Sequence, residues 1–229
     1  MKKLKVIKII LIIVLFVAGI GIMLYPTYSK KKTEKKQEKL MEDLDKKIKE
    51  NKKNNSTDEN DNNTKKNGYD PELVKEEVKK LQIEENDSVI EQNVTDELLA
   101  KQKVIGTIEI PSINIRFPIV EGSGRANIAV AIGHMTGTSP LGGEGNCVLA
   151  GHHGGIYGKF FKELDFLLQN DKVILTDEYG KMYTYNVDES FKVKPTDVYV
   201  TDNLEGYKLT LITCQDNGKN RLVVRCTLE

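Results

Sequence analysis

The sequence contains no tryptophan, only three cysteines and three histidines, and no net charge at neutral pH. Tryptophan is the best platform for stacking nucleic-acid bases, and the balance of 34 basic against 34 acidic residues provides no attraction for a polyanion. A disulfide framework requires an even number of cysteines, so one thiol here must stay outside any pair. We therefore expect no nucleic-acid partner, and the charge balance indicates no acidic substrate.

Metal and nucleotide motifs are missing as well. The histidines and cysteines have neither the spacing of helix-borne metal ligands nor a Cys-x-x-Cys pattern. The glycines at Gly151, Gly154 and Gly155 are not followed by Lys-Ser or Lys-Thr, as a phosphate-binding loop requires. The sequence therefore predicts no metal and no other cofactor, and these glycines are expected to form turns.

What the sequence does contain is three reactive residues at the ends of predicted strands. Residues 210–214 (TLITC) end in a cysteine, residues 148–152 (VLAGH) end in a histidine, and Arg221 opens the next strand. A cysteine thiolate attacks a carbonyl, a histidine can protonate the departing amine, and a guanidinium can hydrogen-bond the oxygen that becomes negative. We assign Cys214 as nucleophile, His152 as acid/base, and the arginine as oxyanion or substrate clamp.

Two neighbours compete for these roles. His153 follows His152 directly, but in a strand that continues it points to the opposite face. Arg225 shares a strand face with Arg221, but at ~3.3 Å per residue it lies about 13 Å further along. We expect Arg225 to be a solvated or salt-bridged strand residue.

Together these motifs resemble the sortases, the membrane-anchored cysteine transpeptidases of Gram-positive bacteria. Their pattern is a Thr-Leu-x-Thr-Cys strand, an upstream Gly-His and a downstream Arg, matched here by residues 210–214, by Gly151-His152 and by Arg221. The resemblance extends to residues 108–115 (IEIPSINI) and 194–198 (KPTDV), and covers roughly residues 104–229. It favours class A or class D over the pilin-type enzymes.

The resemblance also bears on the choice between His152 and His153 and on two further residues, Thr213 and His134. His152 is preferred over His153 because it follows a glycine as the family histidine does, although many relatives carry Arg at the second position. Thr213 is a candidate substrate-groove residue that should point away from the nucleophile, with plain β-propensity as the alternative. His134, in a Gly/Thr-rich segment where relatives often carry His, is a candidate substrate-groove or structural residue.

A reaction and its partners follow from the resemblance. Cys214 attacks the Thr–Gly amide of a Leu-Pro-x-Thr-Gly (LPxTG) sorting signal on a surface-protein precursor, and an amine then resolves the thioacyl-enzyme. That amine belongs to a peptidoglycan precursor or to a pilin lysine. Glu72 stands where the Asp-Pro-aromatic lid of pilin-polymerising relatives has its aromatic, and the chain ends at Glu229 without a second hydrophobic segment. These features favour wall anchoring.

Three alternatives remain open at this point. The first is a pilin-polymerising sortase. The second is hydrolysis, in which water reaches the thioacyl intermediate before an amine does. The third is a membrane-tethered surface-binding module without turnover, suggested by His153 and by the short loop before Arg221.

The other two cysteines, Cys147 and Cys226, lie within predicted strands among apolar neighbours. A buried small hydrophobe is the ordinary interpretation of such a cysteine. A disulfide between the two is the alternative, since sequence does not reveal whether their Cα atoms approach the ~5.5 Å that a bridge requires.

Residues 1–28 are interpreted as a cytoplasmic tip and a membrane anchor. Lys2, Lys3, Lys5 and Lys8 precede an apolar run over residues 9–24. Its 16 residues fall short of the ~20 that cross a bilayer, but Lys8 can snorkel toward the headgroups. A cleaved signal peptide is less consistent, because no small-x-small cleavage site follows the run. By resemblance, the N-terminus lies inside the cell and the catalytic domain outside, in a single-pass protein of the cell membrane.

Residues 29–103 are predicted to form a charged helical stalk and a linker. To about residue 53 the chain is rich in Lys and Glu, with Leu40, Leu44 and Ile48 at four-residue spacing, and a coiled-coil dimer is an alternative to a single stalk. Residues 54–67 lack hydrophobes and indicate a disordered linker. Asp70-Pro71 then favours a capped helix start over a lid.

Residues 104–229 change to short runs rich in Ile, Val, Thr and Tyr, separated by Gly, Pro, Asn and Asp. This pattern predicts an all-β catalytic domain. One helical insertion is expected over residues 159–168, and the family fold implies a closed eight-stranded barrel with short helices between strands.

Overall fold

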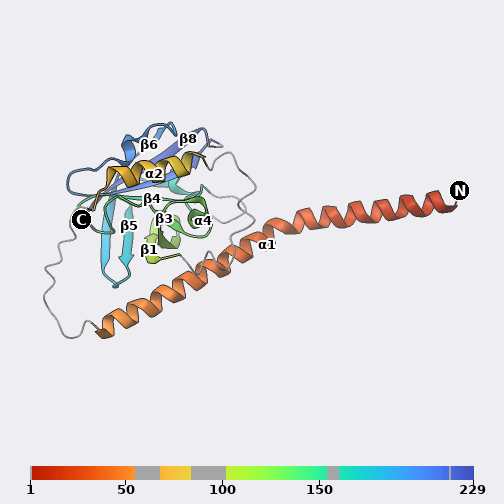
Figure 1. The fold of residues 1–229 in the computed structure, drawn as a ribbon, viewed down its shortest axis with the longest axis horizontal. Helices are drawn as coiled ribbons and strands as arrows, with labels where there is room; N and C mark the ends of the chain where they lie inside the picture. The colour runs from red at the N-terminus through yellow and green to blue at the C-terminus, as the bar shows by residue number, and fades with distance from the viewer. Residues whose placement is uncertain (1, 55–67, 84–101, 154–159, 217) are drawn as a thin grey trace.

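The computed structural model describes residues 2–54, 68–83, 102–153, 160–216 and 218–229 (Figure 1). Eight strands close into one barrel in the order β1-β2-β3-β4-β7-β8-β6-β5, which confirms the predicted all-β architecture. The strands are β1 Val104–Ile110, β2 Ile115–Glu121, β3 Ile132–His134, β4 Gly145–Ala150, β5 Lys172–Asp177, β6 Met182–Val193, β7 Tyr207–Gln215 and β8 Asn220–Leu228. The short helices between them are η3 Pro111–Ile113, α4 Arg125–Ile128, η4 Leu164–Phe166 and η5 Val198–Thr201.

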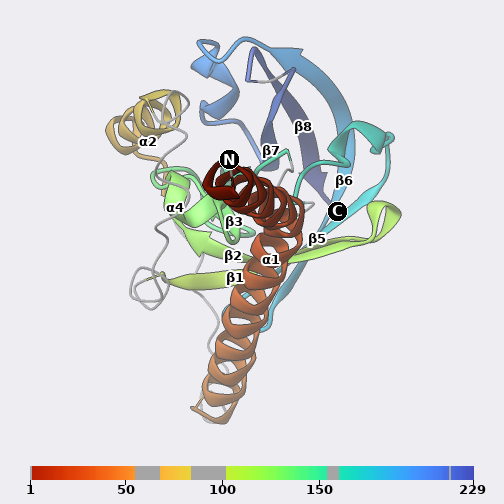
Figure 2. The same cartoon turned by 90° about the vertical axis from the view of Figure 1, so that its right-hand side faces the viewer.

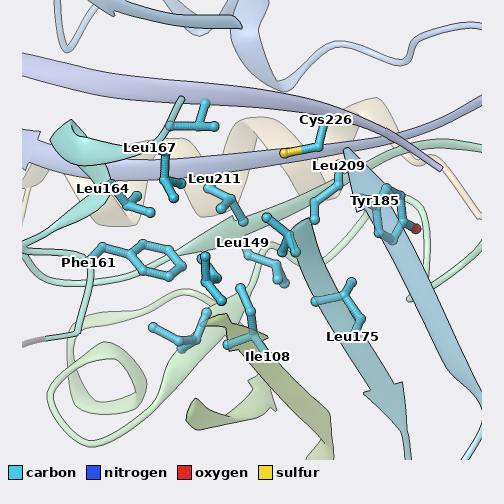
Figure 3. Packing of buried hydrophobic residues seen from close by; sticks show 14 of the residues in the cluster. Ile108, Leu149, Phe161, Leu164, Leu167, Leu175, Tyr185, Leu209, Leu211 and Cys226 are labelled. Atoms are coloured by element: carbon cyan, nitrogen blue, oxygen red, sulfur yellow. The ribbon is translucent and has the colours of Figure 1, made fainter. Parts of the chain in front are cut away.

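Alternation along each strand divides the apolar residues between two sides of the barrel wall. On β7, Leu209 and Leu211 belong to the interior core shown in Figure 3, whereas Ile212 belongs to a separate cluster on the outer face. On β8, Val224 faces the interior and Val223 the outer cluster. Successive side chains of a strand point to opposite faces, so strands buried on both sides are apolar throughout. Residues that share parity with Ile212 and Val223 therefore lie on the outer face.

The helix α2 (Pro71–Ile83) covers part of that outer face through Val74, which is buried. Its start is capped as predicted, because the Asp70 carboxylate accepts from the backbone N–H groups of Glu72 at 3.0 Å and Leu73 at 3.3 Å. Glu77 on the same helix is buried and accepts from both the backbone N–H and the hydroxyl of Ser123. Capping and this buried contact fix both the start and the direction of α2.

The long helix α1 (Lys2–Asn54) projects away from the barrel at its N-terminal end and crosses the barrel at its C-terminal end (Figures 1 and 2). Leu40 and Leu44 are buried there against Val104 and Val120, and Lys47 forms a salt bridge with Glu178. The helical conformation of the charged segment agrees with the sequence. Its docking on the barrel goes beyond the stalk that the sequence predicted.

Within the described part of the chain, no helix combines the length and the apolar character needed to cross a membrane. Of the predicted linker, Asn54 is the last residue of α1, and residues 55–67 lie outside the described residues.

The sequence predicted a helix over residues 159–168, but the described part of this segment contains only a turn and a short 3-10 helix. Lys159 lies outside the described residues, and the chain from Phe160 onward forms a turn that leads into η4, a single 3-10 turn. Phe160 and Phe161 are both fully buried, as is Leu164. Both phenylalanines therefore enter the core from the turn that precedes η4.

The cysteines Cys147 and Cys226 are free thiols with no exposed surface. Cys147 on β4 pairs with Leu209 on β7, which in turn pairs with Cys226 on β8. Two strand spacings, about 9–10 Å, separate their Cα atoms, which is beyond the reach of a disulfide. The disulfide alternative is therefore wrong. Burial raises the pKa of the Cys226 thiol, so it stays protonated.

Candidate active site

The β7–β8 hairpin brings the candidate nucleophile and the candidate cation together. Cys214 near the end of β7 is the direct register partner of Arg221 near the start of β8. Directly opposite residues of an antiparallel pair project onto the same face with Cβ atoms about 4.5–5.5 Å apart. Cys214 has the parity of Ile212, so both side chains of the pair lie on the outer face of the barrel, and both are half-buried.

His152 follows strand β4, which pairs with β7 on the side opposite to β8. The two strands are parallel, with Ala150 opposite Ile212, and the Gly151 N–H donates to the Ile212 carbonyl at 3.1 Å. Extending this register by two residues places His152 level with Cys214 and on the same face. The register thus aligns His152, which lies two residues beyond the end of β4, with the Cys214–Arg221 pair of β7 and β8.

Thr213 lies on the inner side of the wall, opposite to the face that carries Cys214. It is 2% exposed, and its hydroxyl donates to the Gly151 carbonyl at 2.8 Å. This bond ties β7 to the backbone directly before His152. The side chain therefore points away from the nucleophile.

Gly151 is needed because neighbouring side chains leave no room for a Cβ. A Cβ at this position would lie 2.7 Å from the Ile132 Cδ1 atom and 2.8 Å from the Phe161 Cδ2 atom. The chain passes through this gap on its way to His152, whose ring lies 6.3 Å from the Phe160 ring, centroid to centroid. His152 is thus presented by a tightly packed piece of backbone.

The Arg221 guanidinium is held by the loop between β7 and β8. Its Nη1 donates to the Gly218 carbonyl at 3.1 Å and to the Asn220 carbonyl at 3.2 Å. A guanidinium has five N–H donors in a fixed planar arrangement, and both of these bonds come from Nη1. The loop carbonyls orient a cation that is charged at every physiological pH.

His153 and Arg225, the two competitors, have different surroundings. His153 Nε2 lies 3.9 Å from an Asp165 carboxylate oxygen in η4. Arg225 is the register partner of Thr210, and it lies four residues further along β8 than Arg221. Its guanidinium lies 5.7 Å from the centroid of the Phe191 ring, so it stacks on an aromatic side chain, a contact that the sequence pattern did not predict.

His134 is not brought to Cys214. It pairs with Leu149, whose side chain belongs to the interior core, and it is 5% exposed. Its Nδ1 lies 3.2 Å from the Glu121 carboxylate, and its Nε2 donates to the Ser139 carbonyl at 2.9 Å. Both ring nitrogens thus face acceptors, which fits an imidazolium. Burial alone would lower the pKa of His134, but hydrogen bonds to Cys147 and Glu121 raise it to about 10.

Two residues that the sequence motifs did not mark lie beside the candidate pair. Gln215 follows Cys214 and is 7% exposed, and its amide donates to the carboxylate of Asp165. Neither belongs to a recognisable catalytic motif, and the two are separated by 50 residues in the chain. Within the described residues, no group of three His, Cys, Asp or Glu side chains is placed to hold a metal ion.

A family model described as "Sortase domain" matches residues 108–229. Among curated proteins, the chain is 39% identical over 132 residues to sortase A of Streptococcus agalactiae, covering 55% of this chain and 53% of that protein. It is 33% identical over 114 residues to sortase A of Listeria monocytogenes, covering 50% of each. The chain thus spans about half the length of the curated relatives that it matches.

Two solved sortase structures are similar to this chain in fold. The structure of Listeria monocytogenes sortase A superposes with a TM-score of 0.51 at 31% identity, covering 55% of this chain and 87% of that chain. A Clostridium perfringens sortase D5 transpeptidase superposes with a TM-score of 0.51 at 26% identity, covering 69% of this chain and 99% of that chain.

Proposed function

The chain belongs to the sortase family, and we propose that it is a cysteine transpeptidase that cleaves an LPxTG-type sorting signal between Thr and Gly. The new carboxyl end is joined to an amine of the cell-wall precursor. The observation that carries this proposal is that Cys214 and Arg221 are direct register partners on β7 and β8, with His152 two residues beyond the end of the neighbouring strand β4. An imidazole, a thiol and a guanidinium oriented by the β7–β8 loop can together carry out the acylation step and the aminolysis step of acyl transfer.

In the acylation step the Cys214 thiolate attacks the carbonyl carbon of the signal's threonine. The carbonyl oxygen becomes negative, and Arg221, already oriented by the Gly218 and Asn220 carbonyls, donates hydrogen bonds to it. His152 gives its proton to the departing glycine amine as the C–N bond breaks. The product is a thioester between the threonine and Cys214, with the downstream peptide released.

The second step reverses these roles. His152 takes a proton from the incoming amine, which attacks the thioester carbonyl, and Arg221 again stabilises the negative oxygen. Collapse of the intermediate expels the Cys214 thiolate and leaves a new amide bond. Water in place of the amine gives hydrolysis, so the yield of ligated product depends on how well the acceptor competes with water.

We propose that residues 1–28 hold this enzyme at the cell membrane, with the barrel outside. The support is the apolar surface of α1, where each side chain from Ile10 to Val17 is at least 55% exposed. An apolar surface of this size in water marks a membrane or protein contact. Attachment at the membrane would place the barrel where precursors of surface proteins and peptidoglycan meet.

The test is incubation of the purified protein with a fluorogenic LPxTG peptide library and an amine, followed by mass spectrometry. We expect a ligated product in which the amine replaces the glycine segment. Cys214→Ala and His152→Ala should abolish it, and Arg221→Ala should lower kcat by about 10²–10³-fold, as the loss of an oxyanion donor does.

The matched control for Arg221→Ala is Arg225→Ala, which removes the same guanidinium from the same strand and face. We expect kcat to stay within about threefold of wild type, since this group lies about 13 Å from Arg221 along the strand. Cleavage without ligation would indicate a hydrolase or an unsuitable acceptor amine. No acyl-enzyme with any peptide in the library would contradict the proposed reaction.

A further inference from the structure

The segment at residues 160–167, here called the brace segment, connects the end of the His152 loop to the strand β5. Phe160, Phe161, Leu164 and Leu167 of this segment are buried in the interior core, and Figure 3 shows three of them, Phe161, Leu164 and Leu167, on the same side of Leu211 of β7. Because the core holds four of its eight side chains, the brace segment is a fixed part of the barrel. A fixed brace segment can in turn hold the residues that its other backbone and side-chain groups contact.

One set of contacts leads to His152. The Phe161 N–H donates to the His152 carbonyl oxygen at 2.9 Å. The Phe160 ring lies against the His152 ring at a tilt of 59°. The peptide and the imidazole of His152 are thus both touched by consecutive residues of the brace segment.

A second set of contacts comes from Asp165 in η4. One carboxylate oxygen lies 3.9 Å from His153 Nε2, and the other accepts a hydrogen bond from Gln215 Nε2. His153 directly follows His152, and Gln215 directly follows Cys214. One side chain thus touches the residue after each member of the proposed catalytic pair. Gln215 is almost fully buried, so its amide has little freedom to adopt another conformation.

We infer that Asp165 is a positioning residue for the reaction proposed above, because it fixes the ends of β4 and β7 relative to each other. The inference rests on that proposed function for its consequence in catalysis, but the contacts that carry it are independent of substrate. Its physical basis is that proton transfer and attack need aligned groups, and a displacement of about 1 Å can cost about 10²-fold in rate. Asp165 itself touches neither reacting atom.

Other charged groups at this end of the barrel include Asp216 and Lys192, whose side chains lie 3.7 Å apart, and Arg221. These groups stay in place when Asp165 is changed. Asp165 therefore has two separable properties, a hydrogen-bond acceptor for Gln215 and a negative charge near His153. Substitution by alanine removes both properties, whereas substitution by asparagine removes only the charge.

The kinetic test uses the full chain with an LPxTG peptide and an amine. Asp165→Ala, which removes the acceptor, should lower kcat by about tenfold or more while KM changes less than about twofold. Asp165→Asn keeps an acceptor oxygen at the same distance and should restore kcat to within about threefold of wild type. The control Asp188→Asn changes another carboxylate that accepts a side-chain hydrogen bond, from Thr227 on β8, and should leave both constants unchanged.

A double-mutant cycle with Gln215→Met tests whether Asp165 acts through its hydrogen bond with Gln215. This substitution keeps the side-chain length and removes the same hydrogen bond from its other end. If Asp165 acts through Gln215, the double variant should be no slower than the slower single variant. If the fold-loss of kcat in the double variant equals the product of the two single losses, the two residues act independently and the inference is overturned. Should Asp165→Ala fail to fold, Gln215→Met alone decides, with an unchanged kcat counting against the inference.

A substrate-free readout keeps this inference distinct from the proposed function. The rate of Cys214 alkylation by iodoacetamide, followed against pH by mass spectrometry, reports the thiolate fraction. A displaced His152 stabilises the thiolate less, so Asp165→Ala should raise the pH midpoint, whereas loss of a nearby negative charge alone would lower it. A lowered or unchanged midpoint overturns the inference. If no peptide reacts but the midpoint rises as expected, the proposed function fails and the positioning role stands.

Discussion

At the scale of single residues, neighbouring positions on a strand do different work because they point to opposite sides of the barrel wall. Cys214 presents its thiol on the outer face, while Thr213 directly before it bonds the Gly151 carbonyl inside. His134 likewise points inward, where Glu121 and the Ser139 carbonyl surround it. The Cys214 thiol thus lies on the outer face, while Thr213 and His134 make their polar contacts on the inner side.

We predict that His134 makes the stability of the fold depend on pH. Its pKa is raised from 6.5 to about 10 in the folded protein, so its contribution is fully present below about pH 6.5 and is lost as pH rises through about 10. The free energy of unfolding should fall over that window by on the order of a few kcal/mol. Chemical denaturation at several pH values measures it. His134→Gln should flatten the slope, and equal slopes in both proteins would count against the buried imidazolium.

At the scale of elements, α1 uses a short apolar stripe to dock on the barrel. The sequence predicts a stalk from this helix, with a coiled-coil dimer through the stripe of Leu40, Leu44 and Ile48 as the alternative. The structure places the same stripe against β1, β2 and the segment directly after α4. Lys47 and Asn51 extend the contact to Glu178 beyond the end of β5. The stripe therefore finds its partner within its own chain.

We predict that Leu44→Ala weakens this docking by about 2–5 kcal/mol, the range for truncation of a buried leucine, because Leu44 is 1% exposed. Chemical denaturation should show the loss, and limited proteolysis should cut α1 near its C-terminal end sooner than in wild type. The control Glu42→Ala changes an exposed residue of the same helix and should have little effect. Unchanged stability in Leu44→Ala would mean that α1 does not dock in solution.

At the scale of the whole molecule, one helix joins an exposed apolar surface to a closed barrel. Residues of α1 near its N-terminus expose apolar side chains, and residues near its C-terminal end are buried on the barrel. A barrel with no free sheet edge is a rigid unit. The proposed attachment and the proposed reaction therefore belong to different parts of the chain.

We predict that deleting residues 1–28 moves the protein from the membrane fraction to the soluble fraction. The kcat/KM for an LPxTG peptide should stay within about twofold of the full chain, because Cys214 and Arg221 lie on β7 and β8 and His152 lies just after β4, far from residues 1–28 in the sequence. Cell fractionation measures where the truncated protein is found, and the peptide assay measures its kcat/KM. A truncated protein that remains in the membrane fraction would show that another part of the chain provides the attachment.

The sequence by itself determined those properties that depend on near neighbours. Strand alternation, the all-β domain and the Asp70 helix cap were predicted correctly, because each is encoded within a few residues. The reactive residue types at the strand ends were also visible, so Cys214, His152 and Arg221 could be selected, although their roles stay predictions. The single 3-10 turn in the brace segment was missed, because its shape results from burial in the core.

Only the tertiary structure decided which distant strands lie side by side. Barrel closure sets β7 between β4 and β8, which aligns the three selected residues and separates Cys147 from Cys226 by two strand spacings. The contact of Asp165 with Gln215 spans 50 residues of sequence, and the bond from Thr213 to Gly151 spans 62. No local pattern encodes such pairs, since the register between strands results from packing the whole core at once.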